Sequence, residues 1–200
     1  MKMVKTCFAL VIALTAFTQT RAQTADEIIN KYFDAVGGRD KIAQIKSVRM
    51  ENTIEAMGGE GPSTITILNG KGYRIDSEIN GNKITQVYTD KGGWAVNPFM
   101  GSTTPQAVPE DVYKQNKERL DVGGPLFNYA AKGSKVVLDG REAGAYKLKV
   151  TTVDSTEMEL YIDSATYHLV KLTSSASMMG QMIEITTTFS DFKKSDFGVV

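Results

Sequence analysis

A two-residue period of apolar and polar side chains, repeated along most of the chain after residue 47, constrains the fold more than any other feature. Successive side chains of a strand point to opposite faces, so strict alternation gives each strand one apolar and one polar face. About ten segments alternate in this way, and we expect Asn80-Gly81 and Asp139-Gly140 to form turns between them. The pattern predicts a mainly β fold of sequential antiparallel strands.

Two parts of the chain have helical signals instead. Thr24-Ala25-Asp26-Glu27 fits a capping box, and apolar residues follow at helical spacing until Gly37-Gly38. A short second turn is expected over residues 40–45. Pro109-Glu110-Asp111 is typical of a helix start, and that helix is expected to run to about residue 120. The stretch 98–109 contains three prolines and is predicted to be a loop.

Strands and helices together predict an unclosed antiparallel β half-barrel, with the helices forming a lid over its concave apolar face. A sheet this wide with so few helices would not fill its concavity, which leaves an apolar cavity. Seven methionines lie beyond residue 22, and methionine suits surfaces that accept varied apolar partners, although core filling is the alternative. We expect apolar side chains of the strands and the loop to line this cavity: Met50, Ile54, Ile65, Ile67, Tyr73, Ile75, Val96, Met100, Leu148, Met158, Leu160, Ile162, Val170, Ile183 and Ile185.

Residues 1–22 have the organisation of a secretory signal peptide. Two lysines near the start are followed by an apolar stretch over Cys7–Phe17, and Ala22 precedes the expected cut. An uncleaved membrane anchor is the alternative, but the apolar stretch is shorter than the roughly 18 residues that a span needs. Cleavage before Gln23 would export a single domain, residues 23–200, to the periplasm.

The exported chain offers little chemistry. It would hold 20 basic and 23 acidic residues, a net charge of about −3, which does not suit a nucleic-acid partner. Cys7 is the only cysteine and leaves with the signal, and His168 is the only histidine. Glu157 and Glu159 share the polar face of a strand. We therefore expect no cofactor, no metal and no enzyme activity, the alternative being a buried carboxylate in an apolar cavity that acts on a lipid-like substrate.

A family resemblance rests on an ordered set of motifs. The run Asp90-Lys91-Gly92-Gly93-Trp94-Ala95-Val96-Asn97-Pro98-Phe99 resembles the LolA-like family of periplasmic outer-membrane lipoprotein carriers. Tyr32-Phe33-Asp34-Ala35-Val36-Gly37-Gly38 resembles a lipoprotein-sorting branch of that family. So does the stretch from Gly133 through Asp139-Gly140, Tyr146-Lys147-Leu148 and Tyr161-Ile162-Asp163 to Val170-Lys171. The resemblance covers most of residues 26–197.

The resemblance implies an unclosed β barrel with helices that plug its mouth. Its members hold the acyl chains of a lipoprotein and pass them from an inner-membrane exporter to an outer-membrane receptor. By this resemblance, Trp94, Pro98 and Phe99 would edge the cavity, while plain core packing is the alternative for Trp94. The family's interior arginine has no clear counterpart, because Arg49 and Arg74 both fall on the polar side of their strands.

Two functions follow as hypotheses. The first is a soluble, monomeric periplasmic carrier for the acyl chains of lipoproteins or a related lipid. The alternative is a periplasmic module on the same fold that senses lipid or polypeptide and regulates a membrane partner. Depletion separates them, because loss of a carrier strands lipoproteins in the inner membrane.

Overall fold

The computed structural model describes residues 23–56, 58–178 and 181–200, so the expected signal peptide lies outside the described residues. Within them, eleven antiparallel strands form two unclosed sheets, each with consecutive strands side by side. The first sheet holds β1 (Ser47–Ala56), β2 (Gly59–Leu68), β3 (Gly72–Ile79), β4 (Asn82–Thr89), β5 (Gly92–Asn97) and β6 (Ser102–Ala107). The second holds β7 (Lys135–Glu142), β8 (Ala145–Thr151), β9 (Glu157–Asp163), β10 (Leu169–Met178) and β11 (Gln181–Thr188). The mainly β fold expected from the alternation is confirmed.

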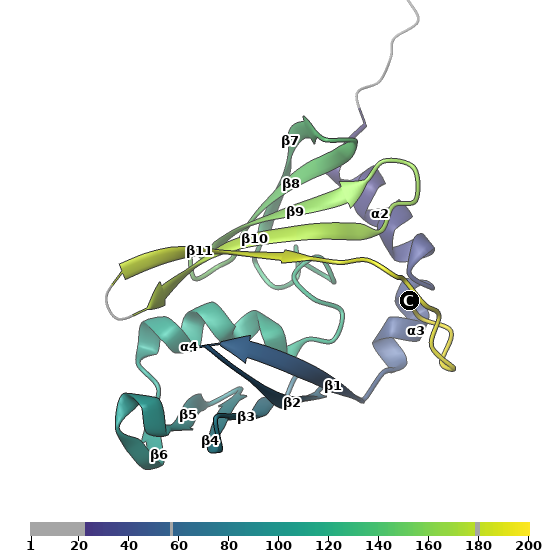
Figure 1. Ribbon diagram of the computed structural model, residues 1–200. Helices are drawn as coiled ribbons and strands as arrows, with labels where there is room; N and C mark the ends of the chain where they lie inside the picture. The colour runs from purple at the N-terminus through teal and green to yellow at the C-terminus, as the bar shows by residue number, and fades with distance from the viewer. Residues whose placement is uncertain (1–22, 57, 179–180) are drawn as a thin grey trace, which may run out of the picture.

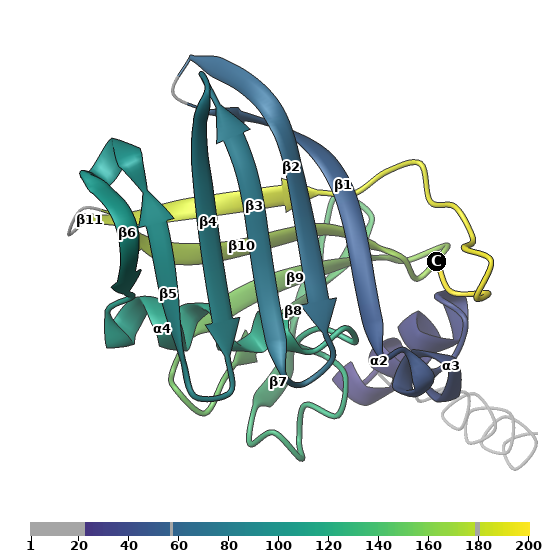
Figure 2. The ribbon, with the colours of Figure 1, turned by 90° about the horizontal axis from the view of Figure 1, so that it is seen from below.

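The two sheets lie one above the other, with helices between them and at one end (Figure 1). Seen from below, the strands of the second sheet cross behind those of the first at a steep angle (Figure 2). α2 (Ala25–Ala35) and α3 (Arg39–Gln44) lie at one end, and α4 (Glu110–Asn116) lies between the sheets near the other. Among the described residues no ladder of hydrogen bonds joins one sheet to the other, so the unclosed antiparallel fold is made of two separate sheets.

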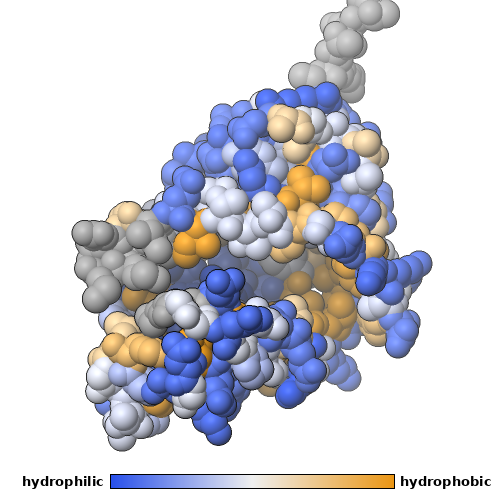
Figure 3. All heavy atoms as spheres, in the orientation of Figure 1, coloured by the Kyte–Doolittle hydropathy of each residue, from blue (hydrophilic) through white to orange (hydrophobic). Residues whose placement is uncertain are grey.

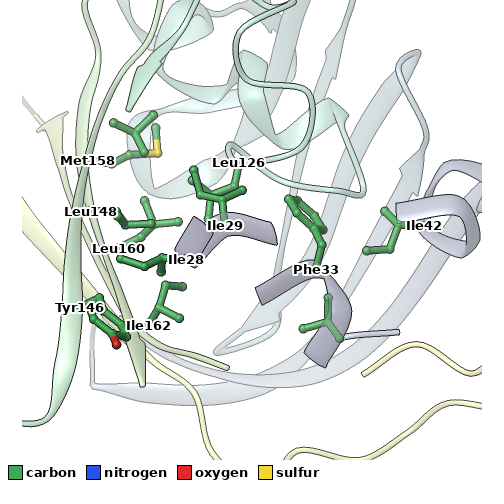
Figure 4. Packing of buried hydrophobic residues seen from close by; sticks show 12 residues of the cluster. Ile28, Ile29, Phe33, Ile42, Leu126, Tyr146, Leu148, Met158, Leu160 and Ile162 are labelled. Carbon is green, nitrogen blue, oxygen red and sulfur yellow. The ribbon is translucent and has the colours of Figure 1, made fainter. Parts of the chain in front are cut away.

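α2 covers the second sheet. Its predicted capping box is present, because the Thr24 hydroxyl accepts from the Glu27 N–H and the Glu27 carboxylate accepts from the Thr24 N–H. The helix ends where Gly37 adopts a positive φ of 115°. Its buried face places Ile28 and Ile29 in a core with β8 and β9 (Figure 4). This core accounts for most of the fully buried apolar side chains and holds the helix on the sheet.

A second, smaller core lies on the inner face of the first sheet. The 3-10 turn η2 (Lys117–Leu120) follows α4 directly and buries Leu120, which is 5% exposed, against Tyr73 and Tyr88. The helix predicted from Pro109 to about residue 120 is therefore present as α4 with a tighter last turn. The turn η2 contacts β2, β3 and β4 of the first sheet, and α4 contacts β10 of the second.

Three local predictions had different outcomes. The Asn80-Gly81 turn between β3 and β4 is confirmed, with both residues at positive φ. The predicted turn at Asp139-Gly140 is wrong: β7 continues through a bulge there, and the chain reverses at Ala143-Gly144. The predicted loop 98–109 contains the 3-10 turn η1 (Pro98–Met100) and strand β6. β6 tolerates Pro105 because it is an edge strand, where a proline need not break a ladder.

Candidate ligand-binding site

A cavity of about 320 Å³ lies between the two sheets. It is bounded on one side by the first sheet, on the other by the second sheet, and at its mouth by α4, η2 and the following turn. A recess between the two halves is visible on the surface (Figure 3). Its lining residues are Ile67, Tyr73, Gln115, Asn116, Glu118, Arg119, Asp121, Gly124, Pro125, Thr156, Met158, Leu172, Ser174, Ser175 and Ile185.

The register of the strands decides which predicted residues face this space. Residues paired directly across strands share a face. Ile67 pairs with Tyr73, and Ile65 pairs with Ile75. On the second sheet, Met158 pairs with Ser174, which pairs with Ile185. These pairings define the inner faces, and four of the residues predicted to line a cavity do line this one: Ile67, Tyr73, Met158 and Ile185.

The other predicted residues occupy several places. Leu148, Leu160 and Ile162 are almost fully buried beneath α2, in the core rather than at the cavity. Trp94 pairs with Val87, which pairs with Arg74, so Trp94 shares the outer, polar face of the first sheet. The remaining predicted residues lie as follows: Met50, Ile54, Ile65 and Ile75 on the inner face of the first sheet away from the lining, Val96 on its outer face, Phe99 and the strongly exposed Met100 in η1, Val170 in a bulge of β10, and Ile183 with its side chain outside the described residues.

We call residues 110–124 the lid. It is fastened to the first sheet by polar contacts. The Val122 N–H donates to the Asn69 side-chain oxygen at 3.1 Å, and the Tyr113 hydroxyl donates to the Thr89 carbonyl oxygen at 2.9 Å. With Leu120 buried on the same sheet, these contacts make the lid a part of the first half of the molecule.

A cluster of charges closes the lid where it meets the turn that leads to the second sheet. The Lys132 Nζ lies 2.8 Å from the Asp121 carboxylate and 3.7 Å from that of Glu118, and it donates to the Gly124 carbonyl oxygen at 3.0 Å. All three charged side chains are about one-fifth exposed. Partial burial strengthens such a network relative to a surface ion pair.

Tyr73 and Arg119 line the cavity, and the buried Tyr88 packs against Tyr73. Tyr73 and Tyr88 are both buried, with 6.3 Å between ring centroids. The Arg119 guanidinium lies 5.7 Å from the centroid of the Tyr73 ring, and its Nη1 is 3.4 Å from the Tyr73 hydroxyl. Burial raises the pKa of the Tyr88 hydroxyl. The buried aromatic rings thus give this wall of the cavity an apolar surface, with the Arg119 cation beside it.

A larger recess, of about 580 Å³, lies outside the pair of sheets, where the segment after β11 folds back on α2. The Val200 N–H donates to the Val36 carbonyl oxygen at 3.0 Å, and Phe189 and Phe192 line the recess. Among the described residues, β10 and β11 of the second sheet and Tyr32 of α2 contribute to its lining, and the first sheet does not. The smaller cavity, which both sheets and residues 110–124 border, is therefore the better candidate for a ligand.

The described residues contain no helix long and apolar enough to cross a membrane. In the same residues, no group of three or more histidine, cysteine or acidic side chains is arranged to hold a metal ion. The lining described above has two acids, Glu118 and Asp121, and both contact Lys132.

The fold and the cavity define a class: unclosed antiparallel β proteins with a cavity between two sheets and a helical segment at its mouth. A LolA superfamily protein from Nitrosomonas europaea has this fold, with a TM-score of 0.51 and 13% identity over 88% of this chain and 81% of that one. A putative outer membrane lipoprotein-sorting protein domain from Vibrio parahaemolyticus is also similar, with a TM-score of 0.45 and 11% identity over 86% and 80% of the two chains. The first of these two likenesses confirms, at the level of the fold alone, the resemblance found in the sequence.

No protein-family model matches the chain. No curated protein matches it by sequence either.

Proposed function

We propose that this protein is a periplasmic carrier, which holds the acyl chains of a lipoprotein or a related lipid between its two sheets and moves them toward the outer membrane. The observation that carries the proposal is the cavity bounded by both sheets and covered by the lid. An inner-membrane exporter would load it, and an outer-membrane acceptor would unload it. The signal peptide expected in residues 1–22 would bring it to that compartment.

The proposed ligand is apolar because the side chains that the sheets contribute to the lining are mostly apolar. Each methylene buried from water contributes about 0.8 kcal/mol, which suffices to hold a chain. A carrier must also release its ligand, so something must compete with the acyl chain for the cavity. The lid, which buries Leu120 on the first sheet, supplies that competing term.

The size of the cavity indicates that loading enlarges it. Pockets for small-molecule ligands have volumes of roughly 300–1,000 Å³, and this cavity, at about 320 Å³, lies at the lower end. The described residues form no hydrogen-bond ladder between the sheets. Parting the sheets around an acyl chain therefore costs side-chain contacts and polar contacts of the lid, and leaves the strand pairing intact.

Binding is favoured over catalysis by the state of the acids at the cavity. A catalytic carboxylate works best in an apolar setting that keeps it free to exchange a proton. Glu118 and Asp121 instead share Lys132 as an ion-pair partner. We therefore propose that the protein is not an enzyme and needs no cofactor.

Uptake of a fluorescent fatty acid or a triacylated peptide by delipidated protein tests the proposal. Leu172→Trp would fill part of the cavity, and we expect it to weaken binding severalfold. Thr66→Trp is the matched control, because Thr66 pairs with Arg49 and Arg74 on the outer face. Absence of uptake at micromolar concentrations, or equal binding by both variants, would sink the proposal.

Depletion of the protein in its host separates the carrier from a sensor on the same fold. We expect lipoproteins to accumulate in the inner membrane when the carrier is lost. If they reach the outer membrane normally while a stable complex with a membrane signalling protein disappears, the regulatory function is the correct one.

A further inference from the structure

A polar cluster far from the cavity surrounds the side chain of Gln23. The Tyr146 hydroxyl donates to the Gln23 side-chain oxygen, and the Arg141 Nη2 lies 3.4 Å from the same oxygen. The Gln23 side-chain nitrogen lies 3.3 Å from the Tyr167 hydroxyl. Lys31 donates to that hydroxyl at 3.2 Å. Every polar atom of this amide therefore has a partner that comes from β7, β8 or the turn before β10.

Further contacts among the residues of the cluster fix their positions. The Arg141 Nη2 also donates to the Tyr146 hydroxyl at 2.6 Å, and its guanidinium lies 4.2 Å from the centroid of the Tyr146 ring. The Tyr146 and Tyr167 rings are stacked, with centroids 6.0 Å apart, and Tyr146 is only 4% exposed. The capping box fixes the next residue, since the Thr24 N–H donates to Glu27. The cluster thus holds the side-chain amide of Gln23, and the capping box holds the backbone of the residue that follows it.

Gln23 is also the residue that the expected signal cleavage would place first in the exported chain. An amino-terminal glutamine can close on itself, because its own α-amine reaches the carbon of its side-chain amide. We propose that the cluster of Arg141, Tyr146 and Tyr167 is a modification site that promotes conversion of amino-terminal Gln23 to pyroglutamate. The inference depends on cleavage before Gln23 and is independent of the carrier function.

The chemistry balances within this one residue. The neutral α-amine attacks the amide carbon, a carbon–nitrogen bond forms, and the electron pair of the carbonyl moves to its oxygen. Arg141 and Tyr146 donate to that oxygen, where the negative charge develops. When the carbonyl re-forms, the bond to the side-chain nitrogen breaks, and ammonia leaves with its electron pair. The α-amine loses one proton and the leaving nitrogen gains one, so the protons balance.

Tyr167 is placed to handle that proton. Its hydroxyl is within hydrogen-bond distance of the nitrogen that leaves. Hydrogen bonds from Gln23 and Lys31 lower the pKa of Tyr167 from 10.0 to about 8, so the hydroxyl gives up a proton more readily than an ordinary tyrosine does.

The test follows ring closure by the loss of one ammonia from the intact mass. The mature chain 23–200, which contains every residue that the structure describes, is released from an amino-terminal fusion by a protease that leaves Gln23 first. We expect the folded protein to lose ammonia at least tenfold faster than the same chain in urea. Tyr146→Phe and Arg141→Gln should each slow the reaction roughly tenfold to a hundredfold.

Tyr161→Phe is the matched control, because Tyr161 is a similarly buried tyrosine that pairs with Lys147 and Lys171 on the other face of the same sheet. Near-ultraviolet circular dichroism checks that each variant is folded. Arg141 is exposed, so its variant keeps the test valid if loss of the Tyr146 hydroxyl disturbs folding. Equal rates in folded and unfolded chains, or in the wild type and both cluster variants, overturn the proposal.

Discussion

The backbone N–H of Gly70 donates to the carbonyl oxygen of Leu120, with 2.8 Å between the two atoms. Gly70 lies in the turn between β2 and β3, and Leu120 is the last residue of η2. This bond joins the lid to the first sheet through the backbone, next to the bond that Asn69 makes with Val122. These hydrogen bonds therefore hold the lid to the first sheet. We expect the lid to separate from the second sheet when the cavity opens.

Replacing Asn69 by alanine should loosen the lid. The Asn69 side chain accepts from the Val122 N–H and donates to the Ile45 carbonyl oxygen, both at 3.1 Å. Its loss leaves two partly buried backbone groups without a partner, at a cost of about 1–3 kcal/mol in the free energy of unfolding. We expect fatty-acid uptake to become faster. Asn82→Ala is the control, because its bond to Asn80 is exposed. An unchanged uptake rate would show that the lid does not gate the cavity.

Replacing Lys132 by methionine should weaken the other end of the lid. The variant removes one cation from two partly buried acids, Glu118 and Asp121, and we expect a loss of about 1 kcal/mol in chemical denaturation. Salt screens such a network, so uptake by the wild type should rise with ionic strength while uptake by the variant should not. Lys114→Met, in an exposed pair with Glu110, serves for comparison. A salt response that persists in Lys132→Met contradicts this role.

Two glycines in strands of the first sheet allow a matched test of its strand register. A Cβ atom added at Gly61 would lie 1.7 Å from the Glu78 carbonyl oxygen, whereas one added at Gly72 has Tyr88 as its nearest neighbour, at 3.8 Å. Gly61→Ala should cost more than about 4 kcal/mol or prevent folding, and Gly72→Ala should change stability by less than about 1 kcal/mol. Thermal unfolding by circular dichroism measures both. Similar melting temperatures for the two variants would contradict the pairing of β2 with β3.

Asp163 gives the stability of the protein a dependence on acid. The backbone N–H and the hydroxyl of Thr166, with the Ala165 N–H, lower the pKa of the Asp163 carboxyl below 3.8. A carboxyl whose pKa falls on folding stabilises the folded state above its ordinary pKa, and that stabilisation is lost as the pH falls through the lowered value. Asp163→Asn should therefore melt at a lower temperature than the wild type at pH 7.

The difference between the two proteins should shrink as the pH falls below about 3.8, the ordinary pKa of aspartate. Asp90→Asn, at an exposed turn position, provides the control and should show little difference at either pH. If the melting temperatures of Asp163→Asn and the wild type stay equally far apart in acid, the contacts of Asp163 do not act through its charge.

The elements that could be predicted are those specified by local interactions. The capping box at Thr24 and the turn at Asn80-Gly81 need only neighbouring residues, and both are present. The turn expected at Asp139-Gly140 failed because Gly140, at φ 100°, serves equally well in a bulge, and Gly144 ends the hairpin instead. A glycine indicates an unusual backbone conformation, without deciding between a turn and a bulge.

Only some of the residues that line the cavity could be predicted, because local patterns do not fix the register of the strands. Alternation shows which residues of a strand share a face, and register decides which face that is. The short turn between β4 and β5 pairs Val87 with Trp94, which puts Trp94 on the outer face. A helical lid was predicted, but none of the lid residues that line the cavity was among the predicted site residues. Arg119 and Asn116 have the pattern of a solvated helix surface, and only the second sheet opposite them makes that surface a wall.

The described residues form no hydrogen-bond ladder between the two sheets, and this has a consequence for the motions of the protein. Amide protons within each sheet should exchange with solvent equally slowly whether or not an acyl chain is present, since filling the space breaks none of their bonds. Deuterium uptake should change mainly along residues 110–134, a single continuous band of the chain. The two sheets would then move apart as rigid bodies connected by residues 110–134. The register of each strand pair would stay the same during loading and release of the ligand.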